Sequence, residues 1–204
     1  MEKTKYNPEI HHRKSIRLKG YDYSKEGLYF VTICTHNREN LFGEIKDGEM
    51  FLNEFGKIAE EKWFDLLNHI KNIELHEFVV MPNHIHGIIE ICTIDIVGAG
   101  SKPAQYSEQK MNQESMVYSK PKSKTRTGLE PAPTGNVKLS EIVRQYKTFT
   151  AKQINKHRNI QGIPVWQRNY YENIIRNEEI YNKVSEYIKT NPQRWTEDKY
   201  HKII

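Results

Sequence analysis

The sequence predicts an α+β fold in which helices pack against an antiparallel sheet. Runs rich in β-branched and aromatic residues alternate with segments in which apolar residues recur at helical spacing. Short turn signals join two pairs of these strand-like runs, so the paired strands should run in opposite directions. A chain of 204 residues suits one domain with a substantial core, and we therefore expect residues 1–204 to form a single domain.

Three strands are expected first, and a helix follows them. The strand-like runs are GLYFVTICT (27–35), LFGEI (41–45) and EMFLN (49–53). The dipeptide Asp47-Gly48 is a hairpin signal between the second and the third run. Asn53 is a candidate N-cap, and apolar residues recur at helical spacing through residues 54–70. This segment is predicted to be one helix.

A second hairpin is expected from the runs IELHEFVV (73–80) and HIHGIIEIC (84–92). We expect the intervening residues 81–83 to form a three-residue turn, which would place Val80 opposite His84. Because side chains alternate between the faces of a strand, the face of His84 would then carry other groups as well. They are Glu74, His76, Phe78, His86 and Glu90.

Two more helices and one strand are expected in the last third of the chain. A helical pattern spans residues 138–156 with Ser140 as its N-cap, and residues 165–176 are strand-like. Asn177 is the N-cap of a last helix, which the dipeptide Asn191-Pro192 ends.

Residues 98–136 have a composition of their own. They contain four of the eight prolines, four glycines, and six lysines or arginines against three glutamates. A segment with this composition cannot bury enough apolar surface to fold, so we expect a disordered basic loop.

The charge balance favours a partner that carries phosphate. The chain has 31 basic and 26 acidic residues, a net charge of +5 and a pI near 9.0. Cys34 and Cys92 do not form a disulfide framework, and no stretch is apolar enough for a signal peptide or a membrane span. We therefore expect a soluble, cytoplasmic protein that does not bind membranes.

His84 and His86 stand two positions apart in the otherwise apolar run VVMPNHIHGIIEI (79–91). Side chains at this spacing share one face of a strand, so the two imidazoles could bind one divalent ion together with ligands from elsewhere. The alternative is that both are ordinary core histidines, because the spacing alone is a weak motif.

Tyr187 and Asn191 lie four positions apart on the last predicted helix and so share a face. They could bring a hydroxyl and an amide oxygen to the same ion or substrate. Equally, Tyr187 could be core, since it belongs to an apolar stripe with Ile180, Val184 and Ile188.

Four stretches together resemble the IS200-like tyrosine transposases, and in particular the branch associated with repetitive extragenic palindromes (REP). In chain order they are IRLKGYDYSKEGLYFVTICTHNRENLFG, VVMPNHIHGIIEI, VWQRNYYENIIRNEEIY and YIKTNPQRW. They resemble, respectively, the N-terminal signature of that branch, its histidine-hydrophobic-histidine motif, its penultimate strand and its tyrosine helix. The matches cover most of the chain outside the first dozen residues and the 98–136 loop.

The resemblance implies a ferredoxin-like sheet, the fold of the HUH endonucleases. It implies that Tyr187 is a nucleophile and that His84, His86 and Asn191 hold a divalent metal, Mg²⁺ or Mn²⁺. The implied activity is transposase-like: a metal-dependent endonuclease and strand transferase that cuts and rejoins single-stranded DNA through a covalent phosphotyrosine. The implied substrate is single-stranded DNA beside a REP-like hairpin, bound by a monomer or a homodimer.

One departure from the family pattern leaves other functions open. Asn173 stands where related sequences usually have histidine, which allows a DNA-hairpin-binding protein without catalytic activity. A metal-dependent nuclease that uses water, with Tyr187 only in the core, is a further alternative. Candidate contacts to the DNA backbone, chosen by charge and nearness to the motifs, are Arg17, Lys147, Arg168 and Arg176.

Overall fold

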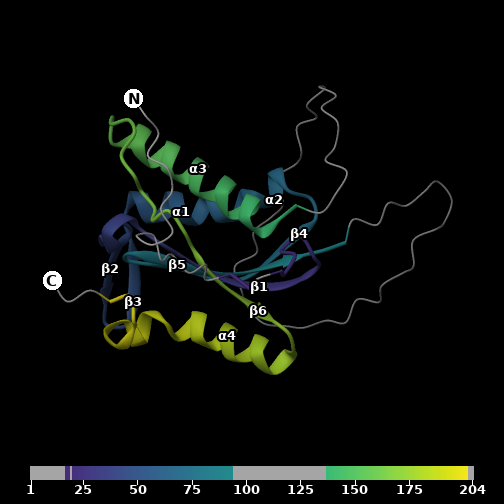
Figure 1. Cartoon of the computed structure of the whole chain (residues 1–204). Coiled ribbons are helices and arrows are strands. Elements are labelled where there is room, and N and C mark those ends of the chain that lie inside the picture. Colours follow the sequence, from purple (N-terminus) through teal and green to yellow (C-terminus); the bar gives the residue numbers. More distant parts are fainter. Residues whose placement is uncertain (1–16, 19, 94–136, 202–204) are drawn as a thin grey trace, which may run out of the picture. The chain divides into compact units, whose positions relative to one another are not determined.

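The computed structural model describes residues 17–18, 20–93 and 137–201, and it confirms the α+β class (Figure 1). The predicted loop at 98–136 lies outside the described residues. The elements in chain order are β1 (Gly27–Cys34), η1 (His36–Arg38), β2 (Gly43–Lys46), β3 (Glu49–Leu52), α1 (Glu54–Phe64), α2 (Leu66–His69), β4 (Ile73–Met81), β5 (His84–Ile91), α3 (Leu139–His157), β6 (Tyr171–Ile175), α4 (Glu178–Thr190) and η2 (Pro192–Glu197).

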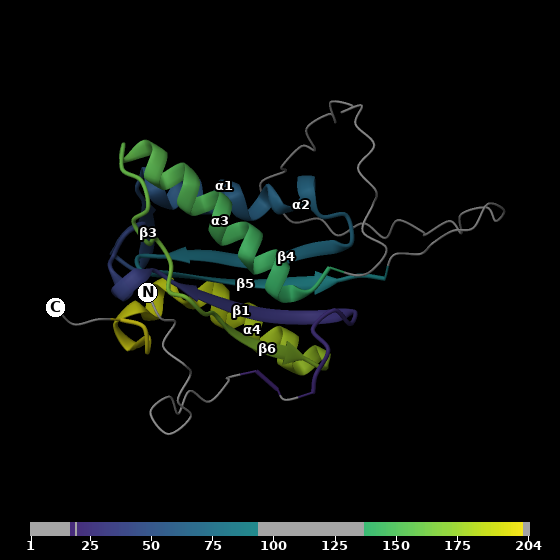
Figure 2. The same ribbon diagram turned by 45° about the horizontal axis from the view of Figure 1, so that its top comes forward.

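Four strands form one antiparallel sheet in the order β4-β5-β1-β6, while β2 and β3 form a separate hairpin. Helices α1, α2 and α3 cover one face of the larger sheet, and α4 covers the other (Figures 1 and 2). This strand order, with a helix between β1 and β4 and another between β5 and β6, is the ferredoxin-like arrangement. The implied architecture is therefore confirmed.

The main core lies between the sheet and helices α1 and α3. Alternate residues of β1, namely Tyr29, Val31 and Ile33, point into it and are fully buried. Trp63 of α1 stacks on Phe78 with ring centroids 4.6 Å apart. Burial of these large apolar side chains is the main stabilising term of the domain.

A smaller apolar cluster lies on the opposite face, where α4 packs. Its buried members are Ile88 of β5, Ile175 of β6 and Ile188 of α4. The cluster fixes α4 against β6 and β5, and β5 carries both histidines. It thereby determines which side chains of α4 meet them.

The helix caps were predicted with mixed success. Asn53 and Asn177 cap α1 and α4 through their side chains, as expected. Ser140 was wrongly predicted as a cap, because α3 begins at Leu139 with Lys138 in the cap position and no side-chain bond there. The single helix predicted over 54–70 is interrupted at Asp65 and forms α1 and α2.

The strand predicted over 165–176 is shorter in the structure. Only Tyr171–Ile175 pairs as β6, while Trp166 forms one isolated bridge with Thr35. The ammonium group of Lys147 on α3 accounts for part of this difference. It donates hydrogen bonds of 2.8 Å to the carbonyls of Gln167 and Asn169, which therefore point toward the helix.

The turn between β4 and β5 has two residues, Pro82 and Asn83, and Met81 lies opposite His84. The predicted three-residue turn was wrong, and Val80 lies in the main core with Phe78. His76 was also predicted to share the face of His84, and this is correct because a β-bulge lies between Leu75 and Phe78. It turns His76 toward the α4 side, where its Nε2 atom lies 2.9 Å from Glu90.

None of the helices in the described part of the chain combines the length and the hydropathy needed to cross a bilayer.

Candidate active site

The two histidines at the start of β5 lie side by side, as the strand periodicity predicts. Their Nε2 atoms are 2.9 Å apart, and both side chains are buried on the face that α4 covers. Burial lowers the pKa of His84 to about 4 and holds the pKa of His86 well below its usual value. Both imidazoles are therefore neutral at physiological pH, the form in which histidine binds metal ions.

The other nitrogen of each ring already has a partner. His84 Nδ1 lies 2.8 Å from Oδ1 of Asn83, whose amide nitrogen donates to the carbonyl of Tyr200 at 2.9 Å. That second bond orients the Asn83 amide, so His84 Nδ1 is the donor. His86 Nδ1 lies 2.8 Å from Thr32 Oγ1. Such outer partners orient metal-binding histidines and direct their Nε2 lone pairs toward a common point.

Helix α4 brings Tyr187 to the histidine pair. Its hydroxyl lies 3.2 Å from His86 Nε2 and 3.1 Å from Asp198 Oδ2. Burial, and next the charge of Asp198, raise the pKa of the tyrosine above its usual value. The hydroxyl is thus protonated in the resting protein and donates to the carboxylate.

Asn191 directly follows α4, and its side chain lies one turn beyond Tyr187, as the spacing predicts. Its Nδ2 atom donates to Asp198 Oδ2 at 2.8 Å. Its Oδ1 atom is buried and has no hydrogen-bond partner within the described residues. A buried amide oxygen without a partner is costly, and a cation at this position would satisfy it.

Asp198 is the site residue that the sequence did not indicate. It lies just after η2, and its second oxygen accepts a hydrogen bond from the Tyr200 backbone N–H. Ligand atoms of His84, His86 and Asp198 all lie within 4.8 Å of one another. Two imidazoles and a carboxylate can bind a divalent transition metal. The residues present therefore fit the expected metal.

A pocket of about 350 Å³ opens beside these groups. Phe30 and the site residues His86, Tyr187 and Asn191 form one part of its lining, and residues after α4 form the rest. Arg194 and Lys199 supply positive charge to this second part. Neither cation was predicted, because both follow Pro192 in a segment that has no periodic pattern.

The four cations predicted to contact DNA lie elsewhere. Arg17 lies 3.6 Å from the Glu172 carboxylate and over the ring of Tyr170. Lys147 is held by backbone carbonyls, and burial lowers its pKa to about 8. Arg168 and Arg176 are exposed near the two ends of β6.

The five other tyrosines after residue 136 occupy environments different from that of Tyr187. Tyr146 and Tyr170 belong to the main core, and Tyr171 is exposed on β6. The Tyr181 hydroxyl lies next to Glu77 and His76. The ring of Tyr200 lies 4.8 Å from that of His84. In the described part of the chain, the Tyr200 hydroxyl forms no hydrogen bond with the imidazole of His84 or His86.

Asn173 lies on the central position of the edge strand β6, opposite Phe30. Since Phe30 lines the pocket, Asn173 borders the site from the same face of the sheet.

Comparison with known proteins agrees with this architecture. No family model matches the chain. An uncharacterized protein of Haemophilus influenzae is 40% identical over 198 residues, which cover 97% of this chain and 98% of that protein. Among solved structures, a REP-associated tyrosine transposase bound to a REP hairpin has a TM-score of 0.51 and 16% identity, and the match covers 90% of this chain and 76% of that one. The chain therefore belongs to one family with the Haemophilus influenzae protein, and its fold is similar to that of the REP-associated tyrosine transposase, as the family resemblance implied.

Proposed function

We propose that the protein is a metal-dependent enzyme that cuts and rejoins single-stranded DNA next to a hairpin, with Tyr187 as the nucleophile. One observation carries this proposal. The Tyr187 hydroxyl lies within 3.2 Å of both an imidazole nitrogen of His86 and a carboxylate oxygen of Asp198, at the edge of an open pocket. Tyr181 also contacts a histidine and a carboxylate, but Tyr187 is the tyrosine that lies beside the paired imidazoles and lines the pocket.

The metal would be held by His84, His86 and an oxygen of Asn191 or Asp198. The nitrogen ligands favour Mn²⁺ over Mg²⁺. When bound, the ion supplies positive charge that polarises a phosphate oxygen and fixes its position. The neutral state of both imidazoles and the unpartnered Asn191 Oδ1 support this assignment.

The chemistry of the chain's own residues is a transesterification. The Tyr187 oxygen forms a bond to phosphorus as its proton passes to the carboxylate of Asp198, and the bond from phosphorus to one deoxyribose oxygen breaks. That oxygen takes up a proton and leaves as a hydroxyl. The phosphotyrosine keeps the energy of the broken ester, so a second DNA hydroxyl can displace Tyr187 and rejoin a strand without ATP.

The pocket is consistent with a single strand as substrate. Arg194 and Lys199 can contact phosphate, and the pocket is too small for a duplex but has room for a phosphate and its sugar. Phe30 in the pocket and the exposed ring of Tyr171 nearby on β6 offer apolar surfaces for unpaired bases. A hairpin as the neighbouring element is supported by the similar structure, which was solved with a REP hairpin.

A covalent adduct tests the proposal. The protein is incubated with Mn²⁺ and a labelled oligonucleotide that contains a palindromic hairpin from the DNA flanking the gene. Denaturing electrophoresis should then show labelled protein. Tyr187→Phe should abolish the adduct, whereas Tyr181→Phe, a matched change on the same helix, should keep it. An adduct that survives Tyr187→Phe, or hairpin cleavage without any adduct, would refute the assignment.

A further inference from the structure

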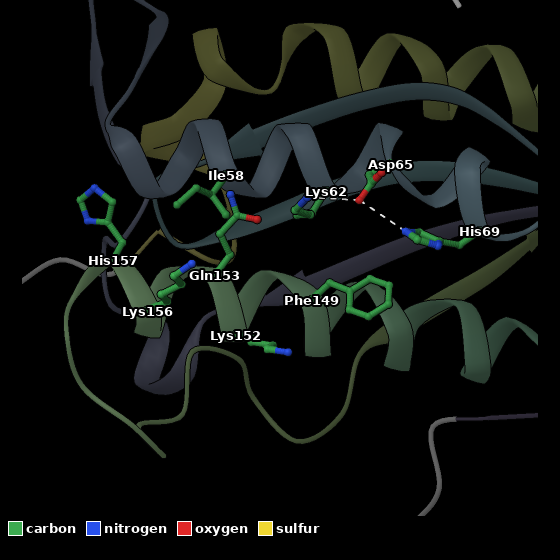
Figure 3. A pocket seen from close by; sticks show the side chains of 9 residues that line it. All are labelled: Ile58, Lys62, Asp65, His69, Phe149, Lys152, Gln153, Lys156 and His157. Carbon is green, nitrogen blue, oxygen red and sulfur yellow. Dashed lines mark hydrogen bonds and ion pairs between the residues drawn. The ribbon is translucent and has the colours of Figure 1, made fainter. Parts of the chain in front are cut away.

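A groove lies between α3 and the α1–α2 pair (Figure 3). These helices cover the face of the sheet opposite α4 and the candidate active site (Figure 1). The volume of the groove is about 610 Å³, larger than that of the pocket beside Tyr187. Ile58 and Phe149 give it an apolar part. The ring of Phe149 is partly exposed in the groove.

The groove is rich in positive charge. Three lysines, Lys62, Lys152 and Lys156, contribute to its lining, and Asp65 is its one carboxylate. This carboxylate already has two partners: the ammonium group of Lys62 at 3.1 Å and the imidazole of His69 at 3.6 Å (Figure 3). The negative charge in the groove is therefore compensated without Lys152 or Lys156.

Lys152 and Lys156 lie one helical turn apart on α3, and both are exposed. Within residues 20–93 and 137–201, neither forms an ion pair with a carboxylate. Both also line a second hollow of about 560 Å³ that continues toward residues 159–162. Both lysines thus line two adjoining hollows.

Stabilisation of the helix explains the presence of a lysine at only one of these two positions. A cation in the last turn of a helix is stabilised by the helix dipole, and this applies to Lys156. The effect is confined to that turn and does not extend to Lys152. Lys152 instead continues an exposed row at four-residue spacing, with Arg144 and Thr148 before it and Lys156 after it. Successive members of the row are about 6 Å apart along the helix axis.

We propose that this groove binds the sugar-phosphate backbone of the DNA substrate at a distance from the cleavage site. The inference rests on the proposed function for the nature of the ligand, and it adds a second DNA contact on the far face of the sheet. Two unpaired ammonium groups one helical turn apart, together with the Gln153 amide, suit neighbouring phosphates of one strand. Contacts of this kind add affinity but do not read sequence, so the groove would anchor the DNA while the pocket selects the cut.

The test compares two variants that remove the same charge. Lys152→Gln/Lys156→Gln changes the groove, and Lys46→Gln/Lys183→Gln changes two exposed lysines on β2 and α4. Binding of the hairpin oligonucleotide is measured by fluorescence anisotropy over a range of salt concentrations. The groove variant should bind on the order of 10-fold more weakly near 0.15 M salt, and its salt slope should fall by about 1 to 2, because each phosphate contact contributes about 0.9. The single-turnover cleavage rate at saturating protein should stay at the wild-type value.

Several results would overturn the inference. One is a groove variant whose affinity for the hairpin and salt slope are unchanged. Another is a control variant that loses as much affinity for the hairpin as the groove variant does. A third is a groove variant that binds poly-glutamate more weakly but binds DNA as well as the wild type. Failure of the proposed function looks different. A protein that binds the hairpin but never cleaves it refutes the catalytic role of Tyr187, while a loss of binding confined to the groove variant still supports the groove.

Discussion

The hydroxyl of Tyr187 lies 3.1 Å from Oδ2 of Asp198, and the same oxygen accepts a hydrogen bond of 2.8 Å from the Asn191 amide. One carboxylate thus joins the proposed nucleophile to a proposed metal ligand. Its other oxygen is fixed by the backbone of Tyr200, so the carboxylate has little freedom to turn. The orientation of the tyrosine therefore depends on the segment that follows α4.

Asp198→Asn should lower the rate of adduct formation about 10²- to 10⁴-fold, the usual contribution of a positioned general base, because Asp198 is the proposed acceptor of the Tyr187 proton. An amide has one acceptor oxygen in place of two, so it cannot serve both the Tyr187 hydroxyl and the Tyr200 N–H, and it brings an NH₂ group to one of these donors. Adduct formed per minute under single-turnover conditions measures the effect.

Glu197→Gln is the matched control, because Glu197 is the next carboxylate in the pocket and has no contact with Tyr187 among those found in the structure. It should leave the rate nearly unchanged. Equal rates for Asp198→Asn and the wild type would show that the contact is incidental.

Much of the site is predictable because it depends on local periodicity. Alternation along a strand places His84 beside His86, and the helical repeat places Asn191 near Tyr187. The structure confirms both relationships. Neither the strand period nor the helix period predicts that the His84–His86 pair should meet the Tyr187–Asn191 pair. This meeting was implied by the family resemblance, and it is achieved by the packing of Ile188 on the sheet.

Neither the position of Asp198 nor the β4–β5 register could be predicted from the sequence, and the physical reason is the same for both. Asp198 reaches the site through a short 3-10 segment after Pro192, where no apolar repeat indicates direction. The two-residue turn is fixed by distant partners, since Phe42 N–H donates to the Pro82 carbonyl and Thr35 N–H to that of Asn83. Contacts between residues so far apart in sequence leave no local pattern.

His84→Ala/His86→Ala should abolish both metal binding and cleavage while leaving hairpin binding nearly intact, because phosphate contacts carry most of the affinity. We expect the wild-type protein to bind Mn²⁺ with a dissociation constant of about 1 μM or weaker, since two imidazoles and oxygen ligands make an open site. Isothermal titration calorimetry measures this, and excess chelator should stop cleavage.

His69→Ala is the control for this experiment. His69 lies on α2, which covers the other face of the sheet (Figure 1), and its imidazole lies 3.6 Å from the Asp65 carboxylate. The variant should bind Mn²⁺ and cleave at the wild-type level. Cleavage by the double variant at an undiminished rate would show that His84 and His86 are core residues only.

Glu172→Gln should raise the stability of the domain at pH 7. The Glu172 side chain is 1% exposed, and burial raises its pKa above the usual value despite Arg17 at 3.6 Å. The folded state therefore holds a proton more tightly than the unfolded state. Stability from this group is present below the unfolded pKa of about 4.3 and is lost as pH rises through the folded pKa.

The glutamine variant should thus show a flatter fall in stability above pH 4 and an unfolding temperature about 2 °C higher at pH 7. Thermal unfolding from pH 4 to 8 measures both quantities. Glu44→Gln, which removes an exposed carboxylate beside Lys46, should change neither. A lower unfolding temperature for Glu172→Gln at pH 7 would mean that the ion pair with Arg17 outweighs the cost of burial.

Gly87→Ala should destabilise the protein by about 1 to 3 kcal/mol, the usual cost of overpacking a core. Gly87 follows His86 on β5 and faces the main core, where a β-carbon would lie 2.3 Å from Cζ2 of Trp63. Trp63 is fully buried and stacked on Phe78, so its ring has no free space to enter.

Trp63→Phe removes the part of the indole that meets the new methyl group. The double variant Gly87→Ala/Trp63→Phe should therefore be more stable in urea denaturation than the sum of the two single losses predicts. Strict additivity would show that the backbone at Gly87, rather than contact with Trp63, requires glycine.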